Sequence, residues 1–333
     1  MAPLGVWQVL VLEKERSLFS DTHFLAGIAV SSLAFLLVAI VPFVGSAAIL
    51  FIPLPVLYYY STTGQLKGSA ILILSLAVSF AILRLLGEQV IFPVLMLLGL
   101  LGIVLAEVLK RKYPLEKAVL YSVAALVALG ALFLLYTSIR SGNAPMHLIG
   151  VSITRKVQES ISIYTQIDPS SEQAKLIKDN ASQIIAFIIN IFPAIIIVSA
   201  SVIVWLNLLA ARAVFTKNAI PFPDFGDLTR WKPPEKLVWI PIVAGIMILL
   251  PGKQAQLIGI NMLLVSLFVY FLEGLAIVGF FFKRGNISPM LRFLFYFVIF
   301  AQQYLMVLVI AVGLFDMWID FRRFSKTTED SAV

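Results

Sequence analysis

Residues 25–44 read LAGIAVSSLAFLLVAIVPFV, which is twenty residues without one charged side chain. A helix of about 20 apolar residues is long enough to cross the hydrocarbon core of a bilayer. The stretch is also longer than the apolar region of a secretory signal, which covers about 7–15 residues. The sequence therefore predicts a first transmembrane helix that is retained in the protein.

The composition of the whole chain agrees with a membrane environment. Of the 333 residues, 60% are hydrophobic and 13% are charged, whereas soluble proteins average about 45–50% apolar and about 25% charged residues. A soluble protein of this length has too much surface to hide such an excess in its core. Lipid removes the conflict, so we predict an all-α, polytopic transmembrane helical bundle.

Further apolar runs follow the first along the chain, and together they predict about nine membrane helices in a single membrane domain over residues 1–333. The run 47–60 is short and holds Pro53 and Pro55. If it is a re-entrant segment buried among neighbours, rather than a crossing, the number becomes eight. The predicted spans are 25–44, 47–60, 69–86, 90–108, 118–136, 184–211, 237–250, 257–282 and 290–318.

The polar stretch 138–181 divides this domain into an N-terminal part, 1–137, and a C-terminal part, 182–333. Within the stretch, Ile149, Ile153, Val157, Ile161 and Tyr164 recur at spacings of three and four residues. Such spacing places apolar side chains on one face of a helix. We predict an amphipathic helix outside the membrane, and the basic residues favour placing residues 112 and 217 in the cytoplasm and residue 155 on the opposite side.

Several classes of function are excluded or disfavoured by the residue inventory. The chain has no Cys and only two His residues, so thiolate chemistry and His-rich metal sites are excluded. Its net charge of +7 is carried by residues beside apolar runs, which indicates membrane topology rather than nucleic-acid binding. Phosphate-binding loops and hydrolase motifs are missing. We predict no catalytic residue, no metal and no cofactor, and hence no enzyme.

Glu273 is the first candidate site residue, because it lies near the middle of the predicted span 257–282. A charged side chain there costs about 2.5–3.5 kcal/mol on insertion scales. The partners expected for it are Gln302 and Gln303 on the following span. The three residues would form either a site for a solute or a proton, or a set of interhelical hydrogen bonds worth about 0.6 kcal/mol each.

A second set of candidates lies at the ends of two predicted spans. Trp231 and Pro233 precede the span 237–250, and the chain after residue 313 ends the last span with alternating acidic, aromatic and basic side chains. One interpretation is an interfacial anchor built around tryptophan, and the other is a surface for docking a partner. The residues concerned at the C-terminal end are Asp316, Trp318, Asp320 and Arg322.

Four stretches in the second half of the chain resemble the YybS-like family of bacterial multi-pass membrane proteins. They are Phe192-Pro193-Ala194, the run LTRWKP at 228–233, the runs GLAIV at 274–278 and FFKR at 281–284, and the run GLFDMWIDFR at 313–322. The first half is similar to the substrate-binding S component of energy-coupling-factor transporters, through the proline-containing run FIPLP at 51–55. The resemblance implies a location in the bacterial cytoplasmic membrane and brings no assigned functional residues.

Two functional hypotheses follow from these observations. The first is an S-component-like protein that binds or transports a small solute. The second is a membrane scaffold without transport activity, which recruits other membrane proteins through the 138–181 stretch and the C-terminal helices. Membrane lipids are expected partners in both cases, and nucleic acid in neither.

Overall fold

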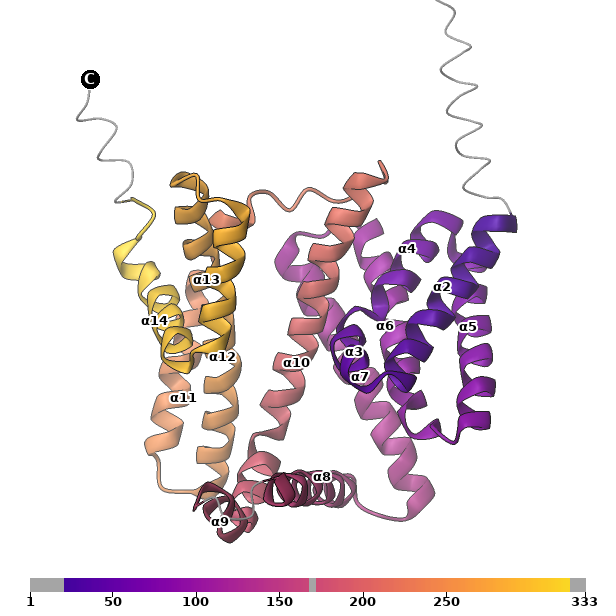
Figure 1. Cartoon of the computed structure of the whole chain (residues 1–333). Coiled ribbons are helices and arrows are strands. Elements are labelled where there is room, and N and C mark those ends of the chain that lie inside the picture. Colours follow the sequence, from indigo (N-terminus) through magenta and orange to yellow (C-terminus); the bar gives the residue numbers. More distant parts are fainter. Residues whose placement is uncertain (1–20, 168–171, 324–333) are drawn as a thin grey trace, which may run out of the picture. The chain divides into compact units, whose positions relative to one another are not determined.

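The computed structural model describes residues 21–167 and 172–323, and within these residues all regular structure is helical. Figure 1 shows long helices joined by short connections. The prediction of an all-α, polytopic helical bundle is confirmed. The helices are α2 (Asp21–Ile40), α3 (Pro42–Ala48), α4 (Pro53–Thr63), α5 (Gln65–Leu86), α6 (Phe92–Lys110), α7 (Leu115–Ser141), α8 (Pro145–Ile167), α9 (Glu172–Asp179), α10 (Ala181–Lys217), α11 (Trp239–Leu249), α12 (Lys253–Arg284), α13 (Pro289–Ala301) and α14 (Gln303–Ile319), with short 3₁₀ turns η1 (Ile49–Phe51), η2 (Gln89–Ile91), η3 (Leu228–Arg230) and η4 (Glu235–Val238).

Seven helical stretches among the described residues are long and apolar enough to cross a membrane, and an eighth is added if α13 and α14 count as one bent span. The segment 44–63, which covers α3, η1 and α4, is one of the seven. The predicted span 237–250 is not among them, because α11 has only 11 residues. The number of candidate crossings is thus at or below the lower end of the predicted eight to nine.

The first predicted span ends earlier than expected, because the chain turns at a proline. Val41 takes an extended backbone conformation, and Pro42 begins the short helix α3. A residue before proline avoids the helical region for steric reasons. Gly45 makes the turn possible, since a Cβ atom there would lie 3.0 Å from the Cα and carbonyl carbon of Val38.

The chain divides into two compact units, of which the first contains the described residues up to Pro145 together with Ser199–Asp224. Its core lies where α4 packs between α5 and α6. Leu57, Leu101 and Leu105 are fully buried there. Many outward-facing apolar side chains, in contrast, are exposed, as lipid-facing residues would be.

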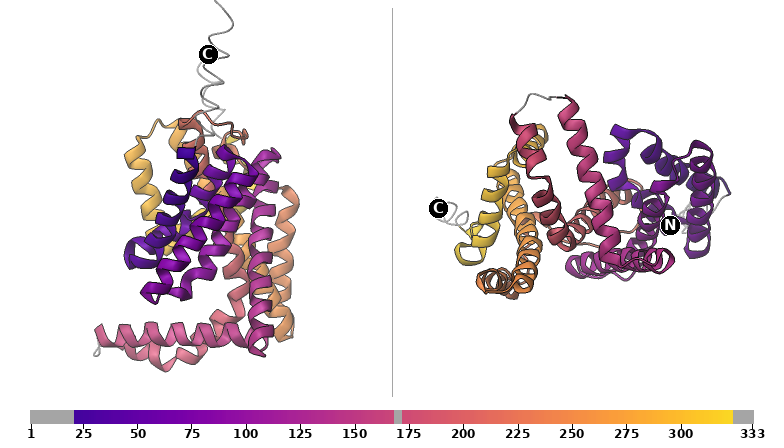
Figure 2. Two further views of the ribbon diagram at one scale, coloured as in Figure 1. Left: turned by 90° about the vertical axis from the view of Figure 1, so that its right-hand side faces the viewer. Right: turned by 90° about the horizontal axis from the view of Figure 1, so that it is seen from below.

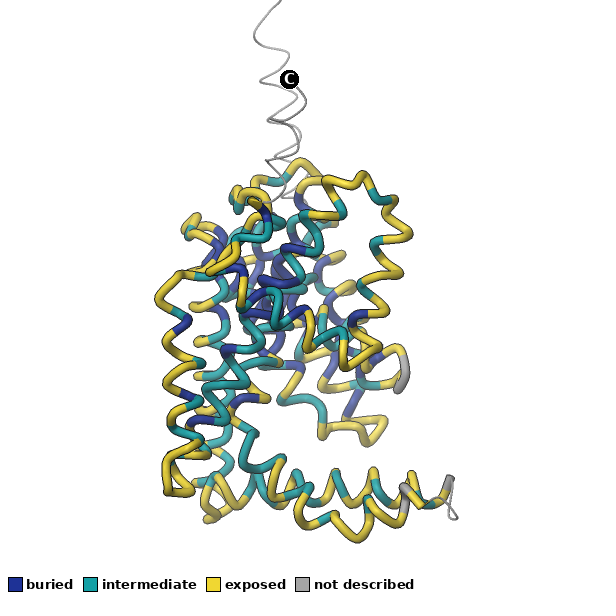
Figure 3. Tube along the Cα trace, turned by 90° about the vertical axis from the view of Figure 1, so that its left-hand side faces the viewer, coloured by how far each residue is buried: buried dark blue, intermediate teal, exposed yellow. Residues whose placement is uncertain are grey.

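The second unit contains the described residues of the ranges 146–198 and 225–323. In it α8 runs across the direction of α12, as Figures 1 and 2 show. None of the described α8 residues is buried, and Figure 3 shows its trace as exposed or intermediate along its length. An amphipathic helix in this arrangement is typical of the membrane surface. The helical nature predicted for the stripe from Ile149 to Tyr164 is confirmed.

Candidate functional site

The second unit is built around α12, which is the longest helix of that unit's core. Its 32 residues correspond to about 48 Å at 1.5 Å per residue, more than the roughly 30 Å of a hydrocarbon core. Lys283 and Arg284 end the helix, and the apolar run 274–282 precedes them. Glu273 lies ten residues before Lys283, or about 15 Å along the helix. Glu273 therefore lies about half a hydrocarbon thickness away from the charged end of the helix.

Only the first half of α12 is covered by α11. Gly259 lies against Ala244 and Met247 of that helix. The second half is covered by the segment that precedes α11, since Thr229 lies beside Gly279 on α12. The Nζ of Lys283 donates a hydrogen bond of 2.8 Å to Asp227.

The segment 227–238 consequently descends along α12 with only short 3₁₀ turns. Backbone without a helix at membrane depth must be buried in protein or line a water-filled space, because lipid offers no hydrogen bonds. This arrangement of a half-length helix and an irregular segment is common in transporters.

The last predicted span, 290–318, is two helices that meet at a bend of 103°. Gln302 takes an extended conformation between α13 and α14, and no Pro or Gly marks the position. Beyond the bend α14 crosses α12 closely: a Cβ atom at Gly313 would lie 2.8 Å from the backbone nitrogen of Gly274. The backbones touch there because both positions are glycine.

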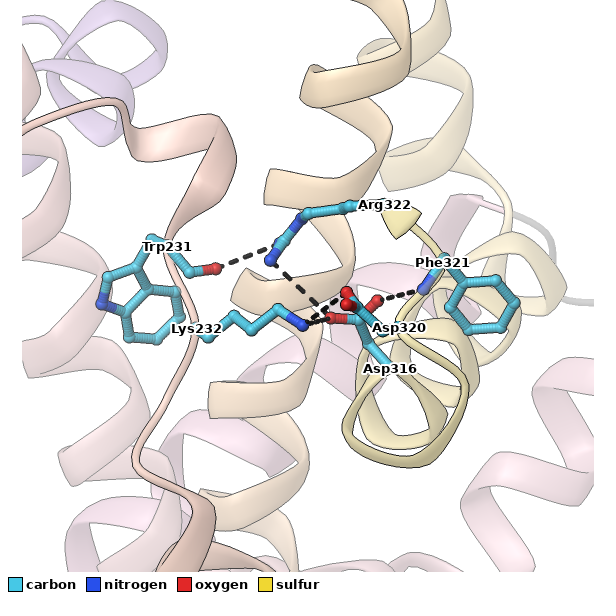
Figure 4. A network of polar contacts seen from close by, with 6 residues as sticks. All are labelled: Trp231, Lys232, Asp316, Asp320, Phe321 and Arg322. Carbon is cyan, nitrogen blue, oxygen red and sulfur yellow. Dashed lines mark hydrogen bonds and ion pairs between the residues drawn. The ribbon is translucent and has the colours of Figure 1, made fainter. Parts of the chain in front are cut away.

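The crossing brings the end of α14 to the irregular segment, where charged side chains gather (Figure 4). The Nζ of Lys232 lies 2.8 Å from an oxygen of Asp316 and 2.9 Å from one of Asp320. Asp316 has no exposed side-chain surface, and its other oxygen accepts a hydrogen bond of 2.8 Å from the backbone N–H of Phe321.

Arg322 completes this group of charges. Its Nη2 donates a hydrogen bond of 3.1 Å to the backbone carbonyl of Trp231, and its Nη1 lies 3.7 Å from Asp316. Its Nε and Nη1 atoms are buried and have no hydrogen-bond partner among the residues that the structure describes. We call Lys232, Asp316, Asp320 and Arg322 the polar cluster.

Glu273 is 2% exposed and lies close enough to the polar cluster for Asp316, Arg322 and Lys232 to act on its charge. The expected hydrogen bonds to Gln302 and Gln303 are not formed among the described residues, and both glutamines are exposed at the bend. The expectation treated the last span as one straight helix, whereas the two glutamines lie at a bend between two helices.

The second predicted set is brought together only in part. Asp316, Asp320 and Arg322 meet in the polar cluster, and Trp231 contacts it through its backbone carbonyl. Pro233 is half-buried beside it, and Trp318 points outward with 60% of its surface exposed.

Lys232 was not predicted as a site residue. The available signal was its position between Trp231 and Pro233, two residues that were predicted. As a cation, it was a candidate partner for Asp316 and Asp320. Within the described part of the chain, no group of three or more His, Cys, Asp or Glu side chains could hold a metal ion.

Asp227 is the first residue of the irregular segment. Hydrogen bonds from Lys283 and Thr229 lower its pKa to about 2. Asp227 therefore stays ionised at neutral pH, and this ion pair fixes the start of the segment against the end of α12.

A model of the family described as "Predicted membrane protein (DUF2232)" matches residues 29–317. The match covers well over half of the chain, so the chain belongs to this family. The matched range includes Lys232, Glu273 and Asp316 and ends before Asp320 and Arg322. No curated protein and no solved structure matches the chain.

Proposed function

We propose that this member of a predicted membrane protein family binds and transports a small charged solute, and that the polar cluster is its binding site. The proposal includes the bacterial cytoplasmic membrane as its location, a non-enzymatic mechanism and a relationship to S components and YybS-like proteins. It rests on the chemistry of the cluster and not on the resemblance.

The observation that carries the proposal is the partial exposure of charged groups at membrane depth. The side chains of Lys232 and Asp320 are 41% and 44% exposed, while that of Asp316 beside them is fully buried. Charged groups open to lipid would be very costly, so such groups face water or a ligand and mark solute or ion pathways. The exposed parts of Lys232 and Asp320 are the surface at which a small solute would bind.

The charges of the site limit the class of solute. Two cations, Lys232 and Arg322, lie among the carboxyl groups of Asp316, Asp320 and Glu273. A solute that carries a cationic group would compete with Lys232 for Asp316, and one that carries an anionic group would engage the Nε and Nη1 donors of Arg322. A small zwitterion, which does both, fits the cluster best.

The test is the purification of the full chain in mild detergent, followed by mass spectrometry of the small molecules that remain bound. Removing one partner of a buried charge pair costs about 3–5 kcal/mol, so we expect Asp316→Asn to lower solute retention at least tenfold. Asp320→Asn, at a more exposed position, should give a smaller loss with an intact fold. Glu235→Gln, an exposed acid outside the cluster, is the matched control and should retain solute normally.

The transport proposal fails if the wild-type chain carries no small molecule. It also fails if the folded fraction of Asp316→Asn, and Asp320→Asn with an unchanged thermal midpoint, retain as much solute as the wild type.

A second candidate function is a scaffold that binds another membrane protein. It is supported by a surface pocket of about 370 Å³ in which Val157, Ile161 and Tyr164 of α8 face Ile177 and Ile184. A protein captured there would co-purify in stoichiometric amount, and Ile161→Glu should release it. The same variant should leave solute retention at the polar cluster unchanged.

A further inference from the structure

The first unit has a pocket of about 300 Å³ at the ends of three helices. Ser61 of α4, the last turn of α6 and the last turn of α10 surround it, and the segment 220–223 covers it. The pocket lies at the water-facing end of these helices, because α6 ends there in the basic run Lys110-Arg111-Lys112.

The inner wall of this pocket is aromatic and firmly held. Phe215 is 2% exposed, and its ring lies edge-on to Tyr58 on one side and to Phe222 on the other, at 6.1 Å and 5.8 Å between centroids. Ile220 and Leu109 extend the same wall. These side chains offer an apolar surface to whatever enters the pocket.

The rim of the pocket is positively charged. Lys110 lies 3.1 Å from Glu107 and 4.6 Å above the ring of Tyr60, so its charge is partly neutralised. Lys112 also lines the pocket and is exposed. No ion pair or hydrogen bond engages the Lys112 ammonium group among the described residues. Lys112 thus supplies a free cation beside apolar walls.

The backbone holds this arrangement in place. Lys112 has a φ of +50°, and Ala219 has a φ of +54°. Left-handed conformations are unfavourable for residues with a Cβ atom. The turn at Lys112 follows α6 and places Lys112 itself at the pocket. The turn at Ala219 follows α10 and places the next residue, Ile220, at the pocket.

We propose that this pocket binds an anionic phospholipid, with its phosphate at Lys112 and Lys110 and its glycerol and first methylene groups against Phe215 and Phe222. The ligand is an amphiphile because the pocket joins a cationic rim to an apolar wall at the membrane surface. Basic pockets between membrane helices bind anionic headgroups for this reason. A soluble anion would leave the aromatic wall unused, and a zwitterionic phospholipid would bring its own cation beside the phosphate that Lys112 binds.

The experiment uses the full chain in detergent, titrated separately with phosphatidylglycerol, phosphatidylcholine and inorganic phosphate, with bound lipid measured by native mass spectrometry. We expect phosphatidylglycerol to be retained in preference to phosphatidylcholine. A free basic residue contributes enough to change affinity about fivefold, so Lys112→Gln should weaken phosphatidylglycerol binding about fivefold. Lys110→Gln should weaken it less, because Glu107 already partly neutralises the Lys110 charge. Lys117→Gln, which removes an exposed cation outside the pocket, should have no effect.

Equal retention of the two lipids would overturn the proposal, as would a Lys112→Gln variant that binds phosphatidylglycerol like the wild type. Displacement of the lipid by inorganic phosphate at millimolar concentration would instead assign the pocket to a soluble anion, and the proposal would again fail. The pocket belongs to the first unit and the polar cluster to the second, so neither outcome bears on the transport proposal.

Discussion

Gly313→Ala tests whether the close crossing of α12 and α14 builds the polar cluster. The added Cβ atom would lie 2.8 Å from the nitrogen of Gly274 and closer still to the carbonyl oxygen of Tyr270, whereas ordinary contacts begin at 3.4 Å. The two helices must therefore separate by at least about 0.6 Å. Overpacking of this kind costs about 1–3 kcal/mol.

The displacement also reaches the charges, because Asp316 follows Gly313 by less than one turn of α14. An ion pair of 2.8 Å between Lys232 and Asp316 would lengthen by a similar amount and lose its geometry. We therefore expect Gly313→Ala to lower both the thermal midpoint in detergent and the retention of solute.

Gly245→Ala is the matched control for this variant. Gly245 lies on α11 of the same unit with open space around its Cα. Alanine is favoured over glycine inside a helix by about 0.5–1 kcal/mol, so this variant should be as stable as the wild type or more so. If Gly313→Ala matched Gly245→Ala in both stability and solute retention, the crossing would not be what positions the cluster.

Three further predictions concern single positions. Glu273→Gln keeps size and hydrogen-bonding capacity, so we expect its thermal midpoint to match the wild type and a deletion strain to be complemented; a folded variant that fails to complement would assign Glu273 an ionisable role. The stabilising Asp227 ion pair, whose carboxyl has a pKa of about 2 against about 3.9 unfolded, is fully present above pH 4 and weakens below it. The midpoints of wild type and Asp227→Asn should therefore converge as pH falls from 5 to 2, and a constant gap would contradict this. Single cysteines at 112 and 217 should resist an impermeant thiol reagent on intact cells while one at 155 reacts; the opposite pattern would reverse the orientation.

The spans that could be predicted from the sequence are those in which a long apolar run forms one uninterrupted helix. The predicted 69–86 corresponds to α5 and the predicted 90–108 to α6, with boundaries a few residues apart. The apolar run has a simple physical cause there, because lipid surrounds a helix whose backbone hydrogen bonds are all formed within the helix. The bend at Gln302 has no such signal, since neither proline nor glycine occurs at it and the run on both sides stays apolar.

The site was harder to predict than the helices because its members come from distant parts of the chain. Lys232 and Asp320 are separated by 88 residues, and only the bend and the glycine crossing bring them together. The sequence nevertheless singled out Asp316 and Trp231, because tryptophan and charged side chains at the ends of apolar runs are typical of the membrane interface. The sequence did not show that Lys232 pairs with Asp316 or that Arg322 contacts Trp231.

The shortness of α11 also has a consequence for how the protein enters the membrane during synthesis. Eleven residues extend about 16 Å as a helix, which is about half of the hydrocarbon thickness. When α11 leaves the ribosome it cannot reach across the bilayer alone, and the irregular backbone before it would be stranded in lipid. It must wait at the insertion machinery until α12 follows and the two can partition as a hairpin. A chain truncated at residue 250 should accordingly leave α11 outside the bilayer, accessible to added protease.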